Sequence, residues 1–182
     1  MRGCCVSLAS VARIGMSGVD MALDYGTRDV VLYIARMLRC FKASKLMSMV
    51  FLAQYDVEGD VVYEYRCGGR PLARAEFYIW STGVVSDEVH DVLEDFDAVS
   101  GEFGLELCYG GPVPQLPQPV AARLTDAVAK YGGWRSWQLE RHVKKLLGLD
   151  IPERLSDYVG YWLYAYLRAE GFRLEIREIC GP

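Results

Sequence analysis

The sequence predicts an α+β fold that is mainly helical, with a winged-helix-like N-terminal half that carries a short antiparallel sheet and a helical C-terminal half. Three observations lead to this prediction. Apolar residues recur at helical spacing in two neighbouring stretches, strand-like runs follow these stretches, and further helical patterns lie beyond a proline-rich segment at residues 110–119. With 182 residues, of which 52% are hydrophobic, the chain is long and apolar enough to bury one core.

Residues 1–24 are predicted to form a flexible extension that precedes a single compact domain at residues 25–182. The extension faintly resembles a signal peptide, but serine, arginine and glycine interrupt its apolar stretch. Met1, Met16 and Met21 are alternative start sites. The longest apolar run, Tyr158 to Leu167, is about half of the roughly 20 residues that a bilayer requires. We therefore expect a cytoplasmic protein that does not enter the membrane.

Two helices are predicted first, with Thr27 and Ser44 as their N-terminal caps. Their apolar residues recur at a spacing of three and four, which places them on one face of each helix. Two strand-like runs follow, with glycine and proline turn formers between them, at residues 61–66 and 75–80. Two helices followed by a two-stranded ribbon are the order of elements in a winged helix-turn-helix.

An acidic amphipathic helix is predicted from Ser86 to Phe96, and a strand from Phe103 to Tyr109. Residues 110–119 predict an extended linker and a sub-boundary within the domain, since proline removes amide donors and restricts the backbone. Beyond the linker the apolar pattern predicts three helices and a terminal strand, at residues 120–131, 136–147, 152–169 and 172–179. The helix at 152–169 is apolar on nearly every side, so we expect it to be buried at the centre of the C-terminal half.

The overall charge argues against general affinity for nucleic acid, because the formal net charge is −4 and such binding depends on a basic surface. Arginine outnumbers lysine by fifteen to five, and asparagine is absent. Loss of thermolabile amides is a trend in heat-adapted proteins. The composition therefore indicates a thermophilic archaeal or bacterial source. The alternative is that the arginine-heavy balance follows simply from genomic base composition.

The six cysteines are scattered, and no pair has the short spacing of zinc ligands. The first interpretation is that they are small buried apolar residues. The second is disulfide bonding, which intracellular proteins of hyperthermophiles use. The better candidates for bridges are the cysteines between elements, not the neighbours Cys4 and Cys5, and the spacing does not indicate how they pair: Cys40, Cys67, Cys108 and Cys180.

No pattern for catalysis or for a cofactor is present in the sequence. His90 shares a predicted helix face with Asp87 and Glu94, and His142 lies among basic residues, so we expect both on solvated faces. Neither histidine has a neighbouring nucleophile, and the glycine pairs form no phosphate-binding fingerprint. We predict a protein that is not an enzyme and needs no cofactor or metal.

Three segments of the chain occur in an order that is typical of a known family. They are Lys45-Leu-Met-Ser-Met-Val-Phe-Leu-Ala-Gln54, the aromatic run Phe77 to Trp80 that continues through Ser81-Thr-Gly-Val-Val85 into a helix, and Leu124 to Gly132 followed by Ser136-Trp-Gln-Leu139. Over residues 27–148 the chain resembles the Panacea (SocA-like, DUF4065) family of small prokaryotic and phage-associated proteins. Thr82 and Val84 replace the tyrosine and proline that the family has around its turn glycine, and Ser48 replaces a lysine.

The resemblance implies a compact α+β domain that acts through protein partners, as an antitoxin or a protease adaptor. Two surfaces are candidates for the partner. The first consists of aromatic and basic residues of types that are enriched where binding energy concentrates, Trp134, Arg135 and Trp137. The second is an acidic helix face that could steer a basic partner, formed by Asp87, Glu88 and Asp91. The alternative function is a DNA-binding winged-helix regulator, whose second helix would contact DNA through Arg39, Lys42, Lys45 and Ser48. The oligomeric state is left open.

Overall fold

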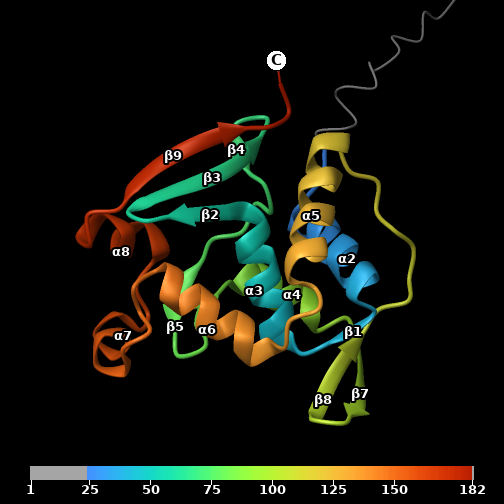
Figure 1. Ribbon diagram of the computed structural model, residues 1–182. Helices are drawn as coiled ribbons and strands as arrows, with labels where there is room; N and C mark the ends of the chain where they lie inside the picture. The colour runs from blue at the N-terminus through green and yellow to red at the C-terminus, as the bar shows by residue number, and fades with distance from the viewer. Residues whose placement is uncertain (1–23, 182) are drawn as a thin grey trace, which may run out of the picture.

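A computed structural model describes residues 24–181 and shows helices and small sheets interleaved along the chain (Figure 1). The helices of this part are α2 (Thr27–Leu38), α3 (Ala43–Gln54), α4 (Asp87–Leu93), α5 (Gln118–Tyr131), α6 (Ser136–Leu146), α7 (Pro152–Tyr158) and α8 (Leu163–Ala169). The strands are β1 (Cys40–Phe41), β2 (Tyr55–Glu58), β3 (Val61–Cys67), β4 (Arg70–Pro71), β5 (Tyr78–Trp80), β6 (Gly83–Val85), β7 (Asp97–Gly101), β8 (Gly104–Cys108) and β9 (Arg173–Glu178). The predicted extension over residues 1–24 and its start sites lie outside the described residues, apart from Asp24.

The predicted division into a winged-helix-like half and a helical half is wrong. Helices α2, α3 and α4 precede the proline-rich segment and α5 to α8 follow it, so helices are not confined to either half. Strand β3 pairs with β2 and β4, whereas β5 pairs with β6, so the two predicted ribbon strands do not pair with each other. The last strand, β9, runs parallel to β3 and returns the chain to the sheet of the first half (Figure 1).

Helix α3 forms the centre of the core. Every side chain from Leu46 to Gln54 is buried, and the helix packs against α2, α5 and α6. The winged-helix hypothesis required this helix to present its outer side chains to a DNA groove. Ser48, one of the predicted DNA contacts, is only 3% exposed. Because the supposed reading helix is enclosed on all sides along most of its length, it has no free face to offer DNA.

The predicted central helix at 152–169 is two short helices at the periphery. Gly160 has a φ of +91°, a left-handed conformation that glycine adopts without strain, and it separates α7 from α8. The residues after it run beside β5, where the Ile79 amide donates to the Tyr161 carbonyl at 2.8 Å. Helix α7 buries no residue, and α8 buries only Leu163, Tyr166 and Leu167. This apolar stretch is therefore a bent segment of two short helices, and its aromatic side chains are partly exposed.

The helix starts were predicted with mixed success. Ser86 caps α4 as expected, since its hydroxyl accepts the Val89 amide at 3.4 Å. Gly26 and Lys42 precede α2 and α3 in place of the predicted caps Thr27 and Ser44. The Thr27 hydroxyl instead donates to the Arg74 carbonyl at 2.9 Å, which ties the start of α2 to the loop before β5.

Two disulfide bonds join parts of the chain that are far apart in sequence. Cys40 is bonded to Cys108 and Cys67 to Cys180, with Cα atoms 4.1 and 4.8 Å apart. The first interpretation of these four cysteines, as buried apolar residues, is therefore wrong, whereas they are the set predicted as better candidates for bridging. Cys4 and Cys5 lie outside the described residues. Among residues 24–181, no helix combines the length and the apolar composition needed to span a membrane.

Candidate functional site

A groove of about 440 Å³ lies between the β7–β8 hairpin, the β1–α3 junction and the loop that joins α5 to α6. We call it the aromatic-basic groove. It brings together residues that the sequence analysis assigned to different functions, namely the aromatic and arginine candidates for a partner surface and two of the DNA-contact candidates. Its lining includes Lys42, Lys45, Phe103, Glu106, Trp134, Arg135 and Trp137.

The two lysines hold the walls of the groove together. Lys42 donates to the Phe103 carbonyl at the tip of the hairpin at 2.8 Å, and Lys45 donates to the Gly132 carbonyl at the end of α5 at 2.6 Å. A cation at a helix C-terminus is also favoured by the helix dipole. Burial lowers the pKa of the Lys45 ammonium, and the Glu106 carboxylate acts in the opposite direction. The lysines therefore position the hairpin and the α5–α6 loop as well as making the groove positive.

The aromatic side chains of the groove are exposed. Trp134 is 36%, Trp137 55% and Phe103 61% exposed. The Trp134 ring is supported edge-on by Tyr131 and His142, at centroid distances of 5.3 and 5.2 Å. Large apolar side chains rarely remain this accessible without a function when they lie next to one another. Neither tryptophan fills the core, so both are free to contact a partner.

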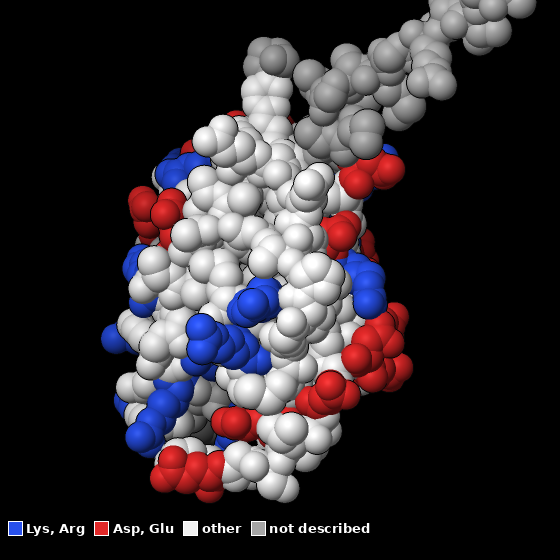
Figure 2. Space-filling view, turned by 90° about the vertical axis from the view of Figure 1, so that its right-hand side faces the viewer, with Lys and Arg blue, Asp and Glu red and all other residues white. Residues whose placement is uncertain are grey.

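Positive charge surrounds the aromatic surface. The Arg135 guanidinium lies 5.3 Å from the centre of the Phe103 ring, an arrangement typical of a cation–π contact. With Lys42 and Lys45 this gives the groove three cations, against one lining carboxylate, Glu106. Figure 2 shows one face of the molecule on which Lys and Arg gather near the centre and along the left, while most Asp and Glu lie on the right and at the lower margin, with a further acidic group at the upper left. The arrangement is suited to hold an anionic segment against aromatic side chains.

The remaining predicted site residues lie elsewhere. Asp87, Glu88 and Asp91 are on α4, and none of them lines the groove. Asp87 and Asp91 are exposed, whereas Glu88 accepts the Ser86 hydroxyl at 2.8 Å and so supports the start of its own helix. Arg39 ends α2 with an exposed side chain and does not line the groove. The acidic face and the aromatic-basic groove are therefore separate surfaces.

Sequence reasoning missed the contribution of the hairpin. Phe103 was read as the first residue of a strand, but it lies in the two-residue turn between β7 and β8, and Glu106 follows on β8. The signal in the sequence was the pair Gly101 and Gly104, because glycine favours turns, and Gly104 adopts a φ of +112° where the chain leaves the turn. What no local pattern contains is the contact of this turn with Lys42 and Arg135, which lie far away along the chain.

The two histidines differ from each other in the structure. His90 is on the exposed face of α4, with its Nδ1 atom 4.0 Å from Glu94 Oε1, as the sequence predicts. His142 is half-buried against Tyr131 and Trp134, contrary to the solvated face that was expected. Burial, together with the charges of Lys130 and Lys145, lowers its pKa. Within residues 24–181, no group of three His, Cys, Asp or Glu side chains is arranged to hold a metal ion.

Comparison with protein-family models, with curated proteins and with solved structures finds no match to this chain. The resemblance to the Panacea family stays a prediction from the sequence.

Proposed function

We propose that the protein is a non-enzymatic regulator that acts by binding a protein partner in the aromatic-basic groove. The observation that carries the proposal is the clustering of exposed Trp134, Trp137 and Phe103 with three cations in one concave surface. Tryptophan and arginine dominate the binding energy of protein interfaces, and a concave setting lets them exclude water on binding. The antitoxin or protease-adaptor role implied by the Panacea resemblance belongs to this class of function.

The charge of the groove indicates the character of the partner segment. Lys42, Lys45 and Arg135 favour carboxylates, and the aromatic rings favour apolar or proline-containing neighbours of those carboxylates. A segment that combines acidic and apolar residues satisfies both. Steering by exposed charges weakens as salt rises, so association with such a segment is expected to slow at high ionic strength.

Capture with matched variants of the full chain tests the proposal. Wild-type protein, Trp137→Ala and Trp80→Ala are used as baits in extracts of the native cell. Trp80 is 46% exposed, close to the 55% of Trp137, but it does not line the groove, so it controls for the loss of an exposed tryptophan. We expect one stoichiometric protein with wild type and with Trp80→Ala, and at least a roughly tenfold loss with Trp137→Ala, the effect of a modest interface hot spot.

The purified partner then allows the affinity of each variant to be measured directly by calorimetry. Equal affinity of wild type and Trp137→Ala for that partner would contradict the groove as the binding site. Specific binding of duplex DNA, with no protein captured, would contradict the proposal that the partner is a protein.

We further propose that the protein works in the cytoplasm of a heat-adapted prokaryote. The two disulfide bonds are compatible with this setting, because intracellular proteins of hyperthermophiles are an exception to the rarity of cytosolic disulfides. Fractionation of the native cell, followed by immunodetection, tests the compartment.

A further inference from the structure

The outer edge of β9 is unpaired within the described part of the chain. The Arg173 amide donates to the Asp60 carbonyl and the Ile179 amide to the Arg66 carbonyl, both at 2.8 Å. The backbone N–H and C=O groups of successive strand residues point to opposite sides of the strand. Glu175 and Arg177, which alternate with Arg173 and Ile179, therefore also direct their backbone groups toward β3. The amides and carbonyls of Leu174, Ile176 and Glu178 therefore face away from β3, where no other described strand pairs with β9. Figure 1 shows β9 as the outermost strand of its sheet.

The side chains along this edge are unusually apolar for an exposed strand. Leu174 is 37% and Ile176 47% exposed, and Trp162 beside them is 41% exposed. Trp162 and Leu174 line a pocket of about 400 Å³ together with Arg66, Tyr164 and Phe172. An open edge with exposed apolar side chains is a template for another strand, and proteins that avoid such pairing block the edge or cover it.

We propose that β9 pairs antiparallel with β9 of a second copy of this chain, about a two-fold axis at Ile176. Only residues with outward backbone groups can exchange hydrogen bonds, so Ile176 meets Ile176 of the partner subunit and Leu174 lies opposite Glu178 of the partner subunit. On the other face, Glu175 of each copy then lies directly opposite Arg177 of the other. Opposite charges at directly paired positions stabilise antiparallel strands.

The neighbouring registers are less favourable. An axis at Glu175 places Glu175 opposite its own copy and Arg173 opposite Arg177 of the other copy, which are like-charge pairs. An axis at Leu174 restores opposite charges, but β9 begins at Arg173, so the overlap shrinks to the first residues of the strand. Like-charge repulsion thus disfavours the axis at Glu175, and the short overlap disfavours the axis at Leu174.

The dimer is independent of the proposed partner binding. β9 lies at the end of the molecule away from the β7–β8 hairpin, so pairing at this edge leaves the aromatic-basic groove open in both copies (Figure 1). The interface is a single strand pair with its adjacent apolar side chains, smaller than a standard stable interface, so we expect reversible association. A dimer with two open grooves would bind a divalent partner with increased avidity.

Sedimentation of the full chain over a range of concentrations tests the proposal. We expect wild type to reach a dimer below about 0.5 mM, as for a weak but specific interface. Glu175→Arg creates two like-charge pairs in the proposed register, so its dimer dissociation constant should rise at least roughly tenfold. Ile176→Pro removes an outward amide and keeps the bonds to β3, because edge strands tolerate proline where the amide faces solvent. It should also be monomeric.

A mixture of two charge variants separates the register from general damage. Glu175→Arg and Arg177→Glu each repel themselves but complement each other, so an equimolar mixture should recover a heterodimer by native mass spectrometry. Arg177 also lies 3.6 Å from the centre of the Tyr63 ring, so circular dichroism must first show that Arg177→Glu is folded, and Ile176→Pro supplies the test if it is not.

Arg141→Glu is the matched control, since Arg141 is exposed on α6 and does not belong to β9, so the same charge reversal should leave the dimer intact there. Arg173 is unsuitable, because its guanidinium forms an ion pair with Glu175 at 3.0 Å. A wild type that stays monomeric at the highest concentration, or a dimer that is unaffected by both Glu175→Arg and Ile176→Pro, overturns the proposal. Loss of the dimer in Arg141→Glu to the same extent as in Glu175→Arg overturns the assignment of the interface to β9.

Discussion

The molecule has two ends that are each closed by one disulfide bond, and they differ in what surrounds the bond. At the hairpin end, formed by β1, β7 and β8, Cys40 is exposed and the hairpin carries exposed Val99 and Leu105. At the sheet end, formed by β2, β3, β4 and β9, Cys67 is fully buried. The hairpin end thus forms one wall of the aromatic-basic groove with few buried contacts, whereas the sheet end contributes buried residues to the core.

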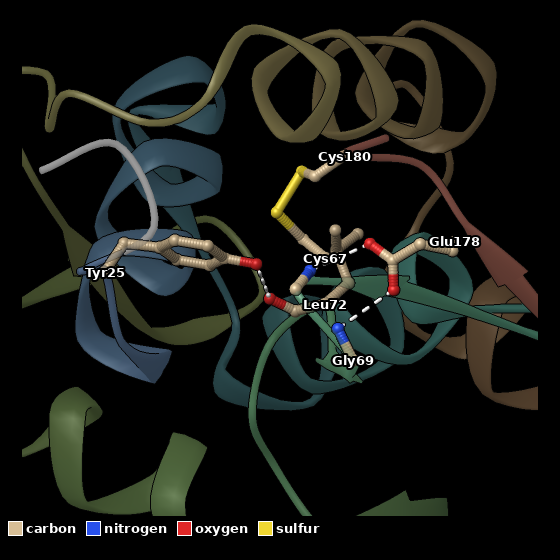
Figure 3. The surroundings of a disulfide bond; sticks show 7 residues. Tyr25, Cys67, Gly69, Leu72, Glu178 and Cys180 are labelled. Carbon is tan, nitrogen blue, oxygen red and sulfur yellow. Dashed lines mark hydrogen bonds between the residues drawn. A yellow bond between two sulfur atoms is a disulfide. The ribbon is translucent and has the colours of Figure 1, made fainter. Parts of the chain in front are cut away.

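The sheet end adds polar contacts around its disulfide. The Glu178 carboxylate accepts the Gly68 and Gly69 amides at 2.8 and 2.9 Å (Figure 3). Both glycines have positive φ values, 63° and 75°, as a tight two-residue turn between β3 and β4 requires. On the other side of Cys67 the Tyr25 hydroxyl donates to the Leu72 carbonyl at 3.0 Å (Figure 3).

A buried carboxylate gives the sheet end its second distinguishing feature. Glu64 on β3 is fully buried, accepts the Tyr164 hydroxyl at 2.7 Å and pairs with Arg66 at 3.1 Å. Burial raises the pKa of the Tyr164 phenol to about 12, with the Glu64 carboxylate acting in the same direction. Similar covalent links therefore lie in different surroundings, one in an exposed hairpin beside the groove and one against the buried core.

Removal of the disulfides should affect the two ends unequally, and this is the largest effect we expect. The closed loops span 68 and 113 residues, so chain entropy alone differs by only about 0.5 kcal/mol between them. Cys67→Ala/Cys180→Ala should lower the free energy of unfolding by about 4 kcal/mol. Cys40→Ala/Cys108→Ala should cost clearly less, because the hairpin can detach locally without unfolding the core. Urea denaturation measures both, and equal losses would contradict the distinction between the ends.

Glu64→Ala should produce the next largest effect. The substitution leaves Arg66 and Tyr164 without their buried partner, so we expect a loss of about 3 kcal/mol in the free energy of unfolding. Glu64→Gln is the control, since it keeps an acceptor for the Tyr164 hydroxyl and should cost less. Absorbance titration of the phenols gives an independent readout, in which the pKa of Tyr164 should fall in both variants. An unchanged stability of Glu64→Ala would show that the buried carboxylate is not needed.

The two regions should also respond to acid in different pH ranges. Burial raises the pKa of Asp56 at the sheet end, but the Tyr65 hydroxyl and Arg123 outweigh it and leave the pKa below the ordinary value of 3.8. His142 beside the groove has a pKa below 6.5, mainly because of burial. For a lowered pKa, the stabilisation is present above the ordinary value and is lost as pH falls through the folded-state value.

Stability measured against pH should therefore begin to fall below about 6.5 because of His142 and again below about 4 because of Asp56. His142→Phe retains an aromatic ring against Tyr131 and Trp134 and should abolish only the first decline. Asp56→Asn should reduce only the second. If the loss of stability below about pH 6.5 persists in His142→Phe, a titrating group other than His142 causes it.

The smallest effect should come from the groove itself. Trp137→Ala on α6 should change the free energy of unfolding by less than about 1 kcal/mol, because the side chain is more than half exposed. Leu139→Ala, two residues further along the same helix, removes a fully buried side chain and should cost about 2–5 kcal/mol. Thermal unfolding of the two variants compares them. A large loss in Trp137→Ala would mean that the tryptophan is structural.

The extent of successful prediction from sequence follows the range of the interactions involved. The helix at Ser86, the helices on either side of Trp134 and the terminal strand were predicted because capping and periodicity act over a few residues. The helix at 152–169 was wrong because an apolar run alone does not distinguish a buried helix from a bend at Gly160 that packs its aromatic residues beside β5. The winged-helix prediction failed because it required the predicted strands at 61–66 and 75–80 to pair with each other. Which strands pair depends on contacts between residues far apart in the sequence, and these cannot be seen in a local pattern.

The candidate site shows the same division. Trp134, Arg135 and Trp137 were selected because their residue types are favourable in interfaces, and Lys42 and Lys45 because they are basic. In the structure the two sets lie in one groove, because Lys42 contacts Phe103 of the β7–β8 hairpin and Lys45 contacts Gly132 at the end of α5. Ser48 was assigned to the surface although α3 is enclosed by helices from both halves of the chain.

By itself the sequence determined where most helices and strands lie and which residue types are available for binding, because these depend on the chemistry of near neighbours. Only the tertiary structure decided which strands pair, which cysteines are bonded and which cations meet the tryptophans. Each of those contacts joins segments tens of residues apart, and its free energy comes from burying the shared core, which no local pattern encodes.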